Sequence, residues 1–158
     1  MITDNQYWNE VYSANKLDHH PSSFAQHCEE NHLHSGNSLL ELGCGNGRDA
    51  LFFVEKGMQV SALDASSKTI EKLSSMNVKN IEFLNQDFSD LTRFTGFDCV
   101  YSRFTMHSVD EKTEQMVFSQ LSQVLKADGL FLMEARSTND EKLEKTFGND
   151  HFRRYLNF

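Results

Sequence analysis

The apolar positions of this chain predict strands that alternate with helices. Five short apolar runs have the length and composition of strands that are buried on both faces: 38–42, 59–64, 80–87, 97–102 and 130–135. Amphipathic helices with one apolar stripe are expected between them, over 48–57, 66–76 and 110–129, with Gly57 and Gly129 at the ends of the first and last. This alternation predicts an α/β fold built on a doubly wound, mainly parallel sheet.

The expected site lies beyond the carboxyl ends of the strands, where ligands of doubly wound sheets bind. Four segments follow the first four predicted strands: 43–48, 64–66, 86–88 and 102–107. The first of them contains GCGNG, between a strand and a helix. Here Gly43 permits a sharp turn, Gly45 lets a ligand approach the backbone, and Gly47 lets the helix start close to the sheet.

Acidic residues stand at the ends of the first three strands. The glycine loop is shorter than the G-x-G-x-x-G fingerprint of dinucleotide sites, and Glu41 beside it disfavours a pyrophosphate and favours a cation. Asp64 offers two oxygens to the two hydroxyls of a ribose, while Asp87 and Phe88 suit the amino group and the ring of adenine. The alternative is structural, because such turns also serve packing alone and aspartates often start turns.

Together these residues resemble the class I S-adenosylmethionine-dependent methyltransferases. The resemblance rests on E-x-G-x-G-x-G after the first strand, Asp after the second and Asp-Phe after the third, and it covers about residues 37–135. It implies S-adenosyl-L-methionine as cofactor and S-adenosyl-L-homocysteine as product. The residues implied to bind the methionine, ribose and adenine parts are Glu41, Gly43, Cys44, Gly45, Asp64, Ala65, Asp87, Phe88 and Ser102.

The segment after the fourth strand, SRFTMHSVDE, is where the chemistry is expected. It is similar to an Arg–aromatic–x–x–His run found in family members that methylate small acceptors. It is not N-P-P-Y, the pattern of many family members that methylate amino groups of DNA and protein, and this difference disfavours a nucleic-acid substrate. His107 is predicted either to remove a proton from the acceptor or only to brace the loop. Arg103 is predicted either to orient an anionic acceptor or to form a structural ion pair.

Charge and composition narrow the function further. The formal net charge of −8, from 23 acidic and 15 basic side chains, argues against a nucleic-acid binder. An apolar stretch long enough for a membrane span is absent, and three widely spaced cysteines suit reduced thiols, so we expect a cytoplasmic protein. Five histidines between 19 and 34, with Cys28, fit no established zinc spacing, so no metal is expected.

The chain is expected to form one domain, 1–158. Residues 1–36 would be a helical cap in which Tyr7, Trp8 and Tyr12 cover the site or simply pack, 37–135 the cofactor-binding core, and 136–158 a C-terminal segment. By the resemblance, the strand order is 3-2-1-4-5, without the family's C-terminal hairpin. The last strand would then be an edge, which predicts reduced stability, a homodimer through that edge, or cover from 136–158.

The leading functional hypothesis is methyl transfer to oxygen or nitrogen of a small-molecule acceptor. Methylation of a protein or an RNA is a second hypothesis, although we see no basic or aromatic recognition surface for it. A non-catalytic module that binds S-adenosylmethionine is a third. A nucleotide-dependent oxidoreductase is a fourth, because a fold by itself does not fix a function.

Overall fold

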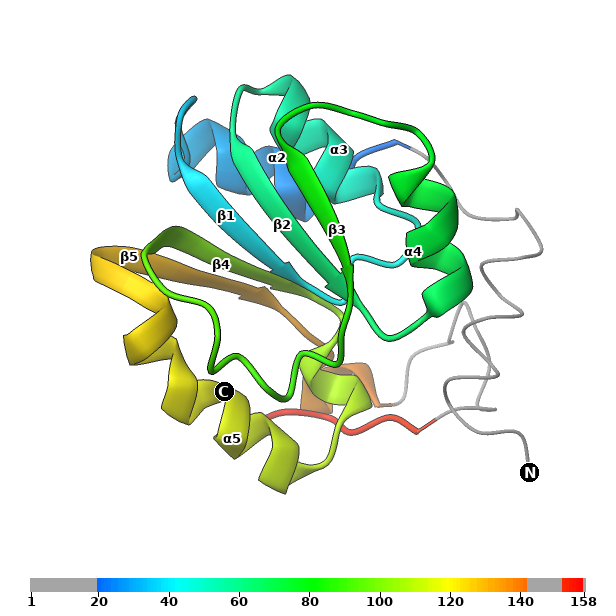
Figure 1. The fold of residues 1–158 in the computed structure, drawn as a ribbon. Coiled ribbons are helices and arrows are strands. Elements are labelled where there is room, and N and C mark those ends of the chain that lie inside the picture. The colour runs from blue at the N-terminus through cyan, green and yellow to red at the C-terminus, as the bar shows by residue number, and fades with distance from the viewer. Residues whose placement is uncertain (1–19, 142–151, 158) are drawn as a thin grey trace.

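A five-stranded parallel sheet forms the centre of the computed structural model, which describes residues 20–141 and 152–157. The strand order is β3-β2-β1-β4-β5, which confirms the expected order (Figure 1). Every pairing between these strands is parallel. The strands are β1 Ser38–Leu42, β2 Gln59–Asp64, β3 Ile81–Asn85, β4 Phe97–Arg103 and β5 Leu125–Glu134.

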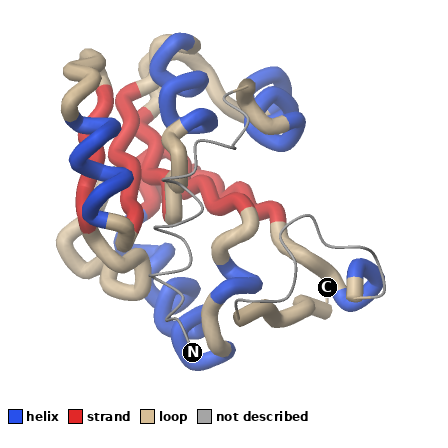
Figure 2. The backbone as a smooth tube through the Cα atoms, turned by 90° about the vertical axis from the view of Figure 1, so that its right-hand side faces the viewer, coloured by secondary structure: helices blue, strands red, loops and turns tan. Residues whose placement is uncertain are grey.

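Helices cover both faces of the sheet, as the turned view in Figure 2 also shows. Three of them pack in one core cluster on one face, and α5 packs in a second cluster on the other. Leu39 belongs to the first cluster and Leu40 to the second, because successive side chains of a strand point to opposite faces. The helices are α2 Ser23–Asn31, α3 Arg48–Glu55, α4 Ser67–Ser74 and α5 Glu111–Val124, with short 3-10 helices η1 Met106–Ser108 and η2 Thr138–Asp140.

Side-chain caps and one glycine set the helix ends that the sequence predicts. Ser22 accepts from the N–H of Ala25 at the start of α2, and Asp110 does the same for Thr113 at the start of α5. Gly57, at φ +87°, ends α3 in the left-handed region. These local signals explain why the predicted helix starts agree closely with the structure.

The predicted helix over 110–129 is wrong at its C-terminal end. Helix α5 ends at Val124, and β5 begins at Leu125, which pairs with Phe97. The register then shifts by a bulge, so that Cys99 faces Leu130. Gly129 is therefore part of the strand and not a helix cap.

An ion pair holds this bulge against the sheet. The Nζ of Lys126 lies 2.6 Å from an Oδ of Asp98, whose other oxygen accepts from the N–H of Ser38 at 2.8 Å. The hydrogen bond from Lys126, followed by the bond from Ser38, lowers the pKa of Asp98 to about 2. These contacts join residues distant in the sequence, so local periodicity could not reveal where the helix ends.

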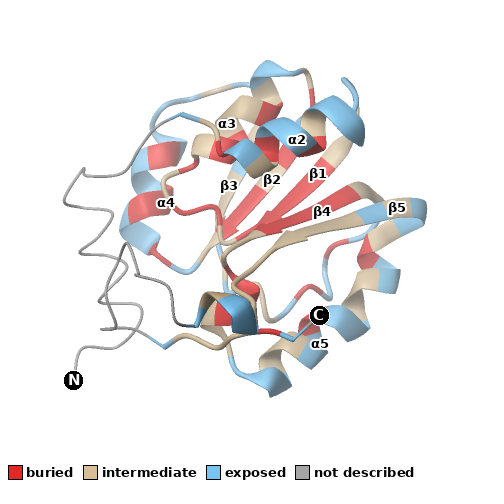
Figure 3. Ribbon diagram, turned by 180° about the vertical axis from the view of Figure 1, so that it is seen from behind, coloured by how far each residue is buried: buried red, intermediate tan, exposed pale blue. Residues whose placement is uncertain are grey.

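Strand β5 forms one edge of the sheet, and within residues 20–141 and 152–157 no strand pairs with its outer side. Figure 3 shows buried central strands, whereas β5 is partly exposed, including Leu130 at 40%. The described part of the C-terminal segment, residues 136–141 and 152–157, makes no strand pairing with that edge. Leu156 instead makes a parallel bridge to Ser137, just beyond β5.

Two sequence predictions concern parts of the chain outside this description. Tyr7, Trp8 and Tyr12, with the first half of the proposed cap, lie outside the described residues. The division into 1–36, 37–135 and 136–158 therefore stays a prediction. Among the helices that are described, none combines the length and the apolar character needed to cross a membrane.

Candidate cofactor site

The loop between β1 and α3 has the turn geometry that the glycine pattern predicts. Gly43, Gly45 and Gly47 have φ values of +73°, +53° and +76°. Such values suit glycine and strain other residues. The N–H of Cys44 donates to Leu63 at 2.8 Å, and its carbonyl accepts from Gly47 at 2.9 Å. The loop is therefore held to the end of β2 by its own backbone.

At two of these positions, neighbouring side chains leave no room for a Cβ atom. A Cβ at Gly43 would lie 2.3 Å from the Cγ2 of Thr105, and one at Gly47 would lie 2.8 Å from a methyl of Leu73. Gly47 thus lets α3 start close to its neighbours, as expected. Packing alone accounts for Gly43 and Gly47, so a ligand has to be inferred from other features of the loop.

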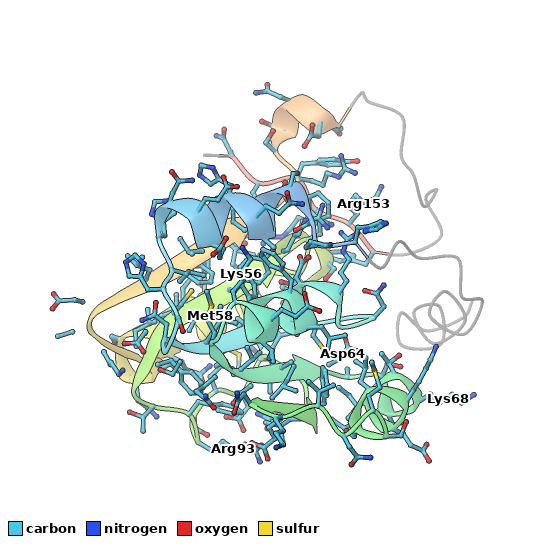
Figure 4. The ribbon with its side chains drawn as sticks, turned by 90° about the horizontal axis from the view of Figure 1, so that it is seen from above. Lys56, Met58, Asp64, Lys68, Arg93 and Arg153 are labelled. Carbon is cyan, nitrogen blue, oxygen red and sulfur yellow. The ribbon has the colours of Figure 1, made fainter. Side chains whose placement is uncertain are left out.

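Asp64 joins the end of β2 to the glycine loop. Its Oδ2 accepts from the N–H of Gly45 at 2.9 Å, and its Oδ1 accepts from the N–H of Ser66 at 2.8 Å. Figure 4 labels Asp64 at this strand end. Burial raises the pKa of Asp64, and the two backbone hydrogen bonds oppose that rise. Each oxygen has a second lone pair, so the carboxylate can still accept from a ligand hydroxyl. Ala65 beside it is exposed.

Glu41 has a buried carboxylate in which one oxygen accepts no hydrogen bond from the described residues. Its side chain is 4% exposed, and its Oε2 has no hydrogen-bond partner among the described residues. Burial raises the pKa of Glu41 well above its usual value, and the nearby carboxylates of Asp49 and Asp64 add to the rise. A buried carboxylate oxygen without a donor is costly, so this position favours a ligand that brings a donor or a positive charge.

The residues after β3 lie beside the same loop. Asp87 is exposed, and its Oδ1 accepts from the N–H of Ser89 at 2.8 Å in a turn. Phe88 is partly buried, and its ring would lie 3.8 Å from a Cβ at Gly43. Phe88 is therefore next to the glycine loop, while the turn geometry of Asp87 is compatible with either of its predicted roles.

The end of β4 makes an ion pair, and the loop that follows it contains a strained residue. Phe104 has φ +56°, an unusual value for a bulky side chain, and its N–H donates to Glu134 at 2.8 Å. Arg103 Nε lies 2.6 Å from Glu134 Oε2, although the two are not aligned as a hydrogen bond. The ion pair is compatible with either role predicted for Arg103, because the other N–H groups of the guanidinium can still donate. Ser102 is fully buried, and its hydroxyl bonds that of Thr105.

His107 is buried, with 5% of its surface exposed, and its Nδ1 faces a backbone donor. The N–H of Arg136 lies 3.3 Å from that nitrogen, and the carbonyl of His107 accepts from Arg154 at 2.7 Å. Because a backbone N–H cannot accept, Nδ1 is the acceptor and the proton of a neutral imidazole sits on Nε2. His107 thus contacts the segment after β5 through both its ring and its backbone, and which of its two predicted roles it has stays a prediction.

The sequence analysis missed a buried network that joins three elements. Asp49, in the first turn of α3, accepts from both the N–H and the hydroxyl of Ser22 at 2.7 Å. Its Oδ2 also accepts from the hydroxyl of Tyr101 at 2.9 Å. Burial raises the pKa of Tyr101, and the charge of Asp49 adds to this rise. The signal available in the sequence was an aspartate on the helix face that must turn towards the sheet.

Cys44 and the histidines give no evidence for a metal. The Cys44 thiol is buried in the core cluster, and burial raises its pKa well above the usual value. Within the described residues, no group of three or more metal-binding side chains comes together. His19 lies outside these residues. Contact between Cys44 and a cofactor stays a prediction.

Comparison with known proteins identifies the family. Residues 39–129, more than half of the chain, match the family described as "Methyltransferase domain". The chain belongs to the methyltransferase domain family. This result confirms the resemblance to class I S-adenosylmethionine-dependent methyltransferases on which the predicted strand order and site residues rest.

The similar proteins are themselves methyltransferases by name. An uncharacterized methyltransferase of Schizosaccharomyces pombe is 30% identical over 121 residues, which cover 73% of this chain and 83% of the relative. A putative methyltransferase of Geobacillus sp. is 31% identical over 106 residues, which cover 63% of this chain. The match spans only 42% of the length of the Geobacillus protein.

Solved structures support the fold of this methyltransferase domain. The 1,6-didemethyltoxoflavin-N1-methyltransferase of Burkholderia thailandensis, determined with bound 1,6-didemethyltoxoflavin and S-adenosylhomocysteine, has a TM-score of 0.66. The two chains share 18% sequence identity over 87% of this chain and 66% of that one. This similarity shows that the two proteins share a fold.

Proposed function

We propose that this domain binds S-adenosylmethionine and transfers its methyl group to oxygen or nitrogen of a small-molecule acceptor. The buried Oε2 of Glu41 supports this proposal best, because it has no hydrogen-bond donor as a partner among the described residues. It lies beside the glycine loop, whose backbone a ligand can approach closely. The ligand of such a position should carry a positive charge. S-Adenosylmethionine carries an ammonium group and a sulfonium, whereas NAD brings a pyrophosphate.

Residues at different strand ends would bind different parts of the proposed cofactor. Glu41 would face the ammonium group of the methionine part, with Gly43 and Gly45 giving that part access to the backbone. Asp64 would accept from the ribose hydroxyls with lone pairs not used by Gly45 and Ser66. A second set of residues would complete the site: Cys44, Ala65, Asp87, Phe88 and Ser102.

When bound, the cofactor supplies an activated methyl group on a sulfonium, so the protein has mainly to position the acceptor. The loop after β4 is the proposed position of that acceptor. Of the two predicted catalytic residues, Arg103 ends β4 and His107 lies in η1 of the loop that follows. The hydrogen bond to His107 Nδ1 supports a role in fixing the loop, which in turn would orient the acceptor.

Two other functions remain as alternatives. A module that binds S-adenosylmethionine without turnover would use the same strand ends and would not need an acceptor. A protein or RNA methyltransferase would need a recognition surface, and the net charge of −8 disfavours an RNA. We favour the small-molecule acceptor because Thr105, Met106 and His107 of the loop after β4 are buried and do not form an open surface for a macromolecule.

Calorimetric titration of the full chain with S-adenosylmethionine, S-adenosylhomocysteine and NAD tests the proposal. We expect the first two to bind and NAD to give no heat of binding. Binding of NAD alone would instead support an oxidoreductase. Binding of S-adenosylmethionine without turnover across a panel of hydroxyl and amine acceptors would support the non-catalytic module.

Two further expectations concern the protein in its cell. The three cysteines in the described residues are free, which supports a reducing compartment such as the cytoplasm. The outer edge of β5 supports a homodimer in which two copies pair through this strand. Light scattering of the purified chain would test the homodimer, and a charged substitution at Leu130 should return it to monomer.

A further inference from the structure

A second arginine lies over the ring of the strained Phe104. The guanidinium carbon of Arg136 is 5.0 Å from the centre of that ring, and the corresponding carbon of Arg103 is 4.3 Å from it. Guanidinium groups stack on aromatic rings while their N–H groups remain able to donate. The ring of Phe104 therefore fixes two cationic side chains at the carboxyl ends of β4 and β5.

The charges around this ring are not balanced. Glu134 lies against Arg103, and Glu114 lies against Arg154 on the neighbouring C-terminal segment. Arg136 makes no ion pair within residues 20–141 and 152–157, and it is only partly exposed. In a protein with a net charge of −8, a positioned guanidinium without an acidic partner indicates that an anion is to be bound there.

Backbone contacts connect Arg136 to the glycine loop. The N–H of Arg136 donates to His107, which follows Thr105 in the loop after β4. Thr105 in turn fills the space where Gly43 lacks a side chain. The guanidinium is thus attached to the same loop that we assign to the acceptor, and not to the strand ends that we assign to the cofactor.

We infer that the acceptor carries an anionic group, a carboxylate or a phosphate, and that Arg136 binds this group with help from Arg103. This inference rests on the proposed function, because it assumes that the loop after β4 receives the acceptor. The planar guanidinium can donate two parallel hydrogen bonds to either anion. The anionic group would anchor the acceptor, while a separate hydroxyl or amine on it would face the methyl group.

Nuclear magnetic resonance of the arginine side chains tests the site with simple anions. Acetate and inorganic phosphate are titrated into the full chain at constant ionic strength, with acetamide as the neutral analogue of acetate. We expect saturable shifts of the Arg136 Nε–H signal with the anions and none with acetamide. Stronger binding of phosphate would indicate a phosphorylated acceptor, and stronger binding of acetate would indicate a carboxylic acid.

Three variants make the test specific. Arg136→Gln should weaken anion binding by about 10- to 100-fold, and Arg136→Lys, which keeps the charge but loses the planar fork, should weaken it less. Arg93→Gln is the matched control, because Arg93 also stacks on a phenylalanine, at 4.9 Å from the ring of Phe94. Arg93 is also remote from the C-terminal segment, since Figure 4 shows Arg93 on the opposite side of the molecule from Arg153, which belongs to that segment. The control should bind the anions like the natural protein.

The outcome separates this inference from the proposed function. Equal shifts with acetamide, or equal losses in Arg93→Gln and Arg136→Gln, would overturn the anion site. Titrating S-adenosylhomocysteine into the same samples checks the other site, and its affinity should change less than twofold in Arg136→Gln. Anion binding that depends on Arg136 without any cofactor binding would keep the anion site and reject the proposed function.

Discussion

The Oδ2 atom of Asp64 accepts a hydrogen bond of 2.9 Å from the backbone N–H of Gly45. This contact joins the end of β2 to the loop after β1, so one carboxylate both shapes the loop and faces the proposed ribose position. Its structural role and its binding role can be separated, because Asp98, at the amino end of β4, also accepts hydrogen bonds and lies far from the carboxyl ends of the strands. Asp98 accepts from the N–H and the hydroxyl of Ser38.

Replacing Asp64 with alanine should weaken the binding of S-adenosylhomocysteine by about 10- to 100-fold, since hydrogen bonds to a charged group are lost. Calorimetric titration measures this change. Asp98→Ala is the control: it should lower thermal stability to a comparable extent and leave the affinity unchanged. Equal affinities in the natural protein and in Asp64→Ala would contradict the ribose assignment.

Replacing Gly43 with alanine should destabilise the protein by about 2 kcal/mol or more. The new Cβ would lie 2.3 Å from the Cγ2 of Thr105, and the φ of +73° adds backbone strain. Thr105→Ser removes that methyl group but keeps the hydroxyl that bonds Ser102. Urea unfolding of the two single variants and the double variant should show a smaller cost for Gly43→Ala in the Thr105→Ser background. An identical cost in both backgrounds would show that the methyl group is not the cause.

Replacing Glu41 with glutamine should stabilise the ligand-free protein at neutral pH. Burial raises the pKa of Glu41, so the folded state holds its proton at pH values where the unfolded state, with a pKa of about 4.3, has released it. The stability of the natural protein therefore falls as pH rises from about 4 towards the raised pKa, by about 1.4 kcal/mol for each pKa unit of the shift.

The thermal midpoints of Glu41→Gln and the natural protein should thus agree near pH 4 and separate as the pH is raised. Glu82→Gln, at an exposed position on β3, is the control for the loss of a carboxylate that is not buried. The same Glu41 variant should bind S-adenosylmethionine more weakly, because the amide has no negative charge for the ammonium group. A gain in both stability and affinity would contradict the proposed role of Glu41.

The network around Asp49 should be energetically coupled. Tyr101→Phe should cost about 1 kcal/mol and Asp49→Asn about 1–3 kcal/mol, because each removes hydrogen bonds from a buried group. Denaturant unfolding of the singles and the double gives their coupling, expected at about 0.5–3 kcal/mol. Additive costs would mean that the two side chains act independently. Asp90→Asn is a suitable reference for the Asp49→Asn variant, because it makes the same change at an exposed position.

Replacing His107 with asparagine should preserve much of the activity. The asparagine oxygen can accept from the N–H of Arg136 as Nδ1 does, so the loop after β4 stays braced. We expect turnover within about tenfold of the natural protein and an unchanged affinity for S-adenosylhomocysteine. A general base contributes about 10²–10⁴-fold to a rate, so a loss of that size at unchanged affinity would restore His107 as the base.

The sequence by itself determined the framework of this protein. Apolar runs and amphipathic stripes gave the strands and most helices, because these patterns repeat over two to four residues and need no distant partner. Gly57 marked a helix end by the same local chemistry. The glycine loop and the acidic strand ends located the expected site, since parallel strands bring their carboxyl ends to one edge.

Only the tertiary structure decided which side chains meet. Asp49 lies 27 residues from Ser22 and 52 from Tyr101, yet the three share one buried network. Arg136 reaches the ring of Phe104 only because β4 and β5 pair side by side. Such contacts depend on how whole elements pack, and local periodicity carries no information about a partner so far along the chain.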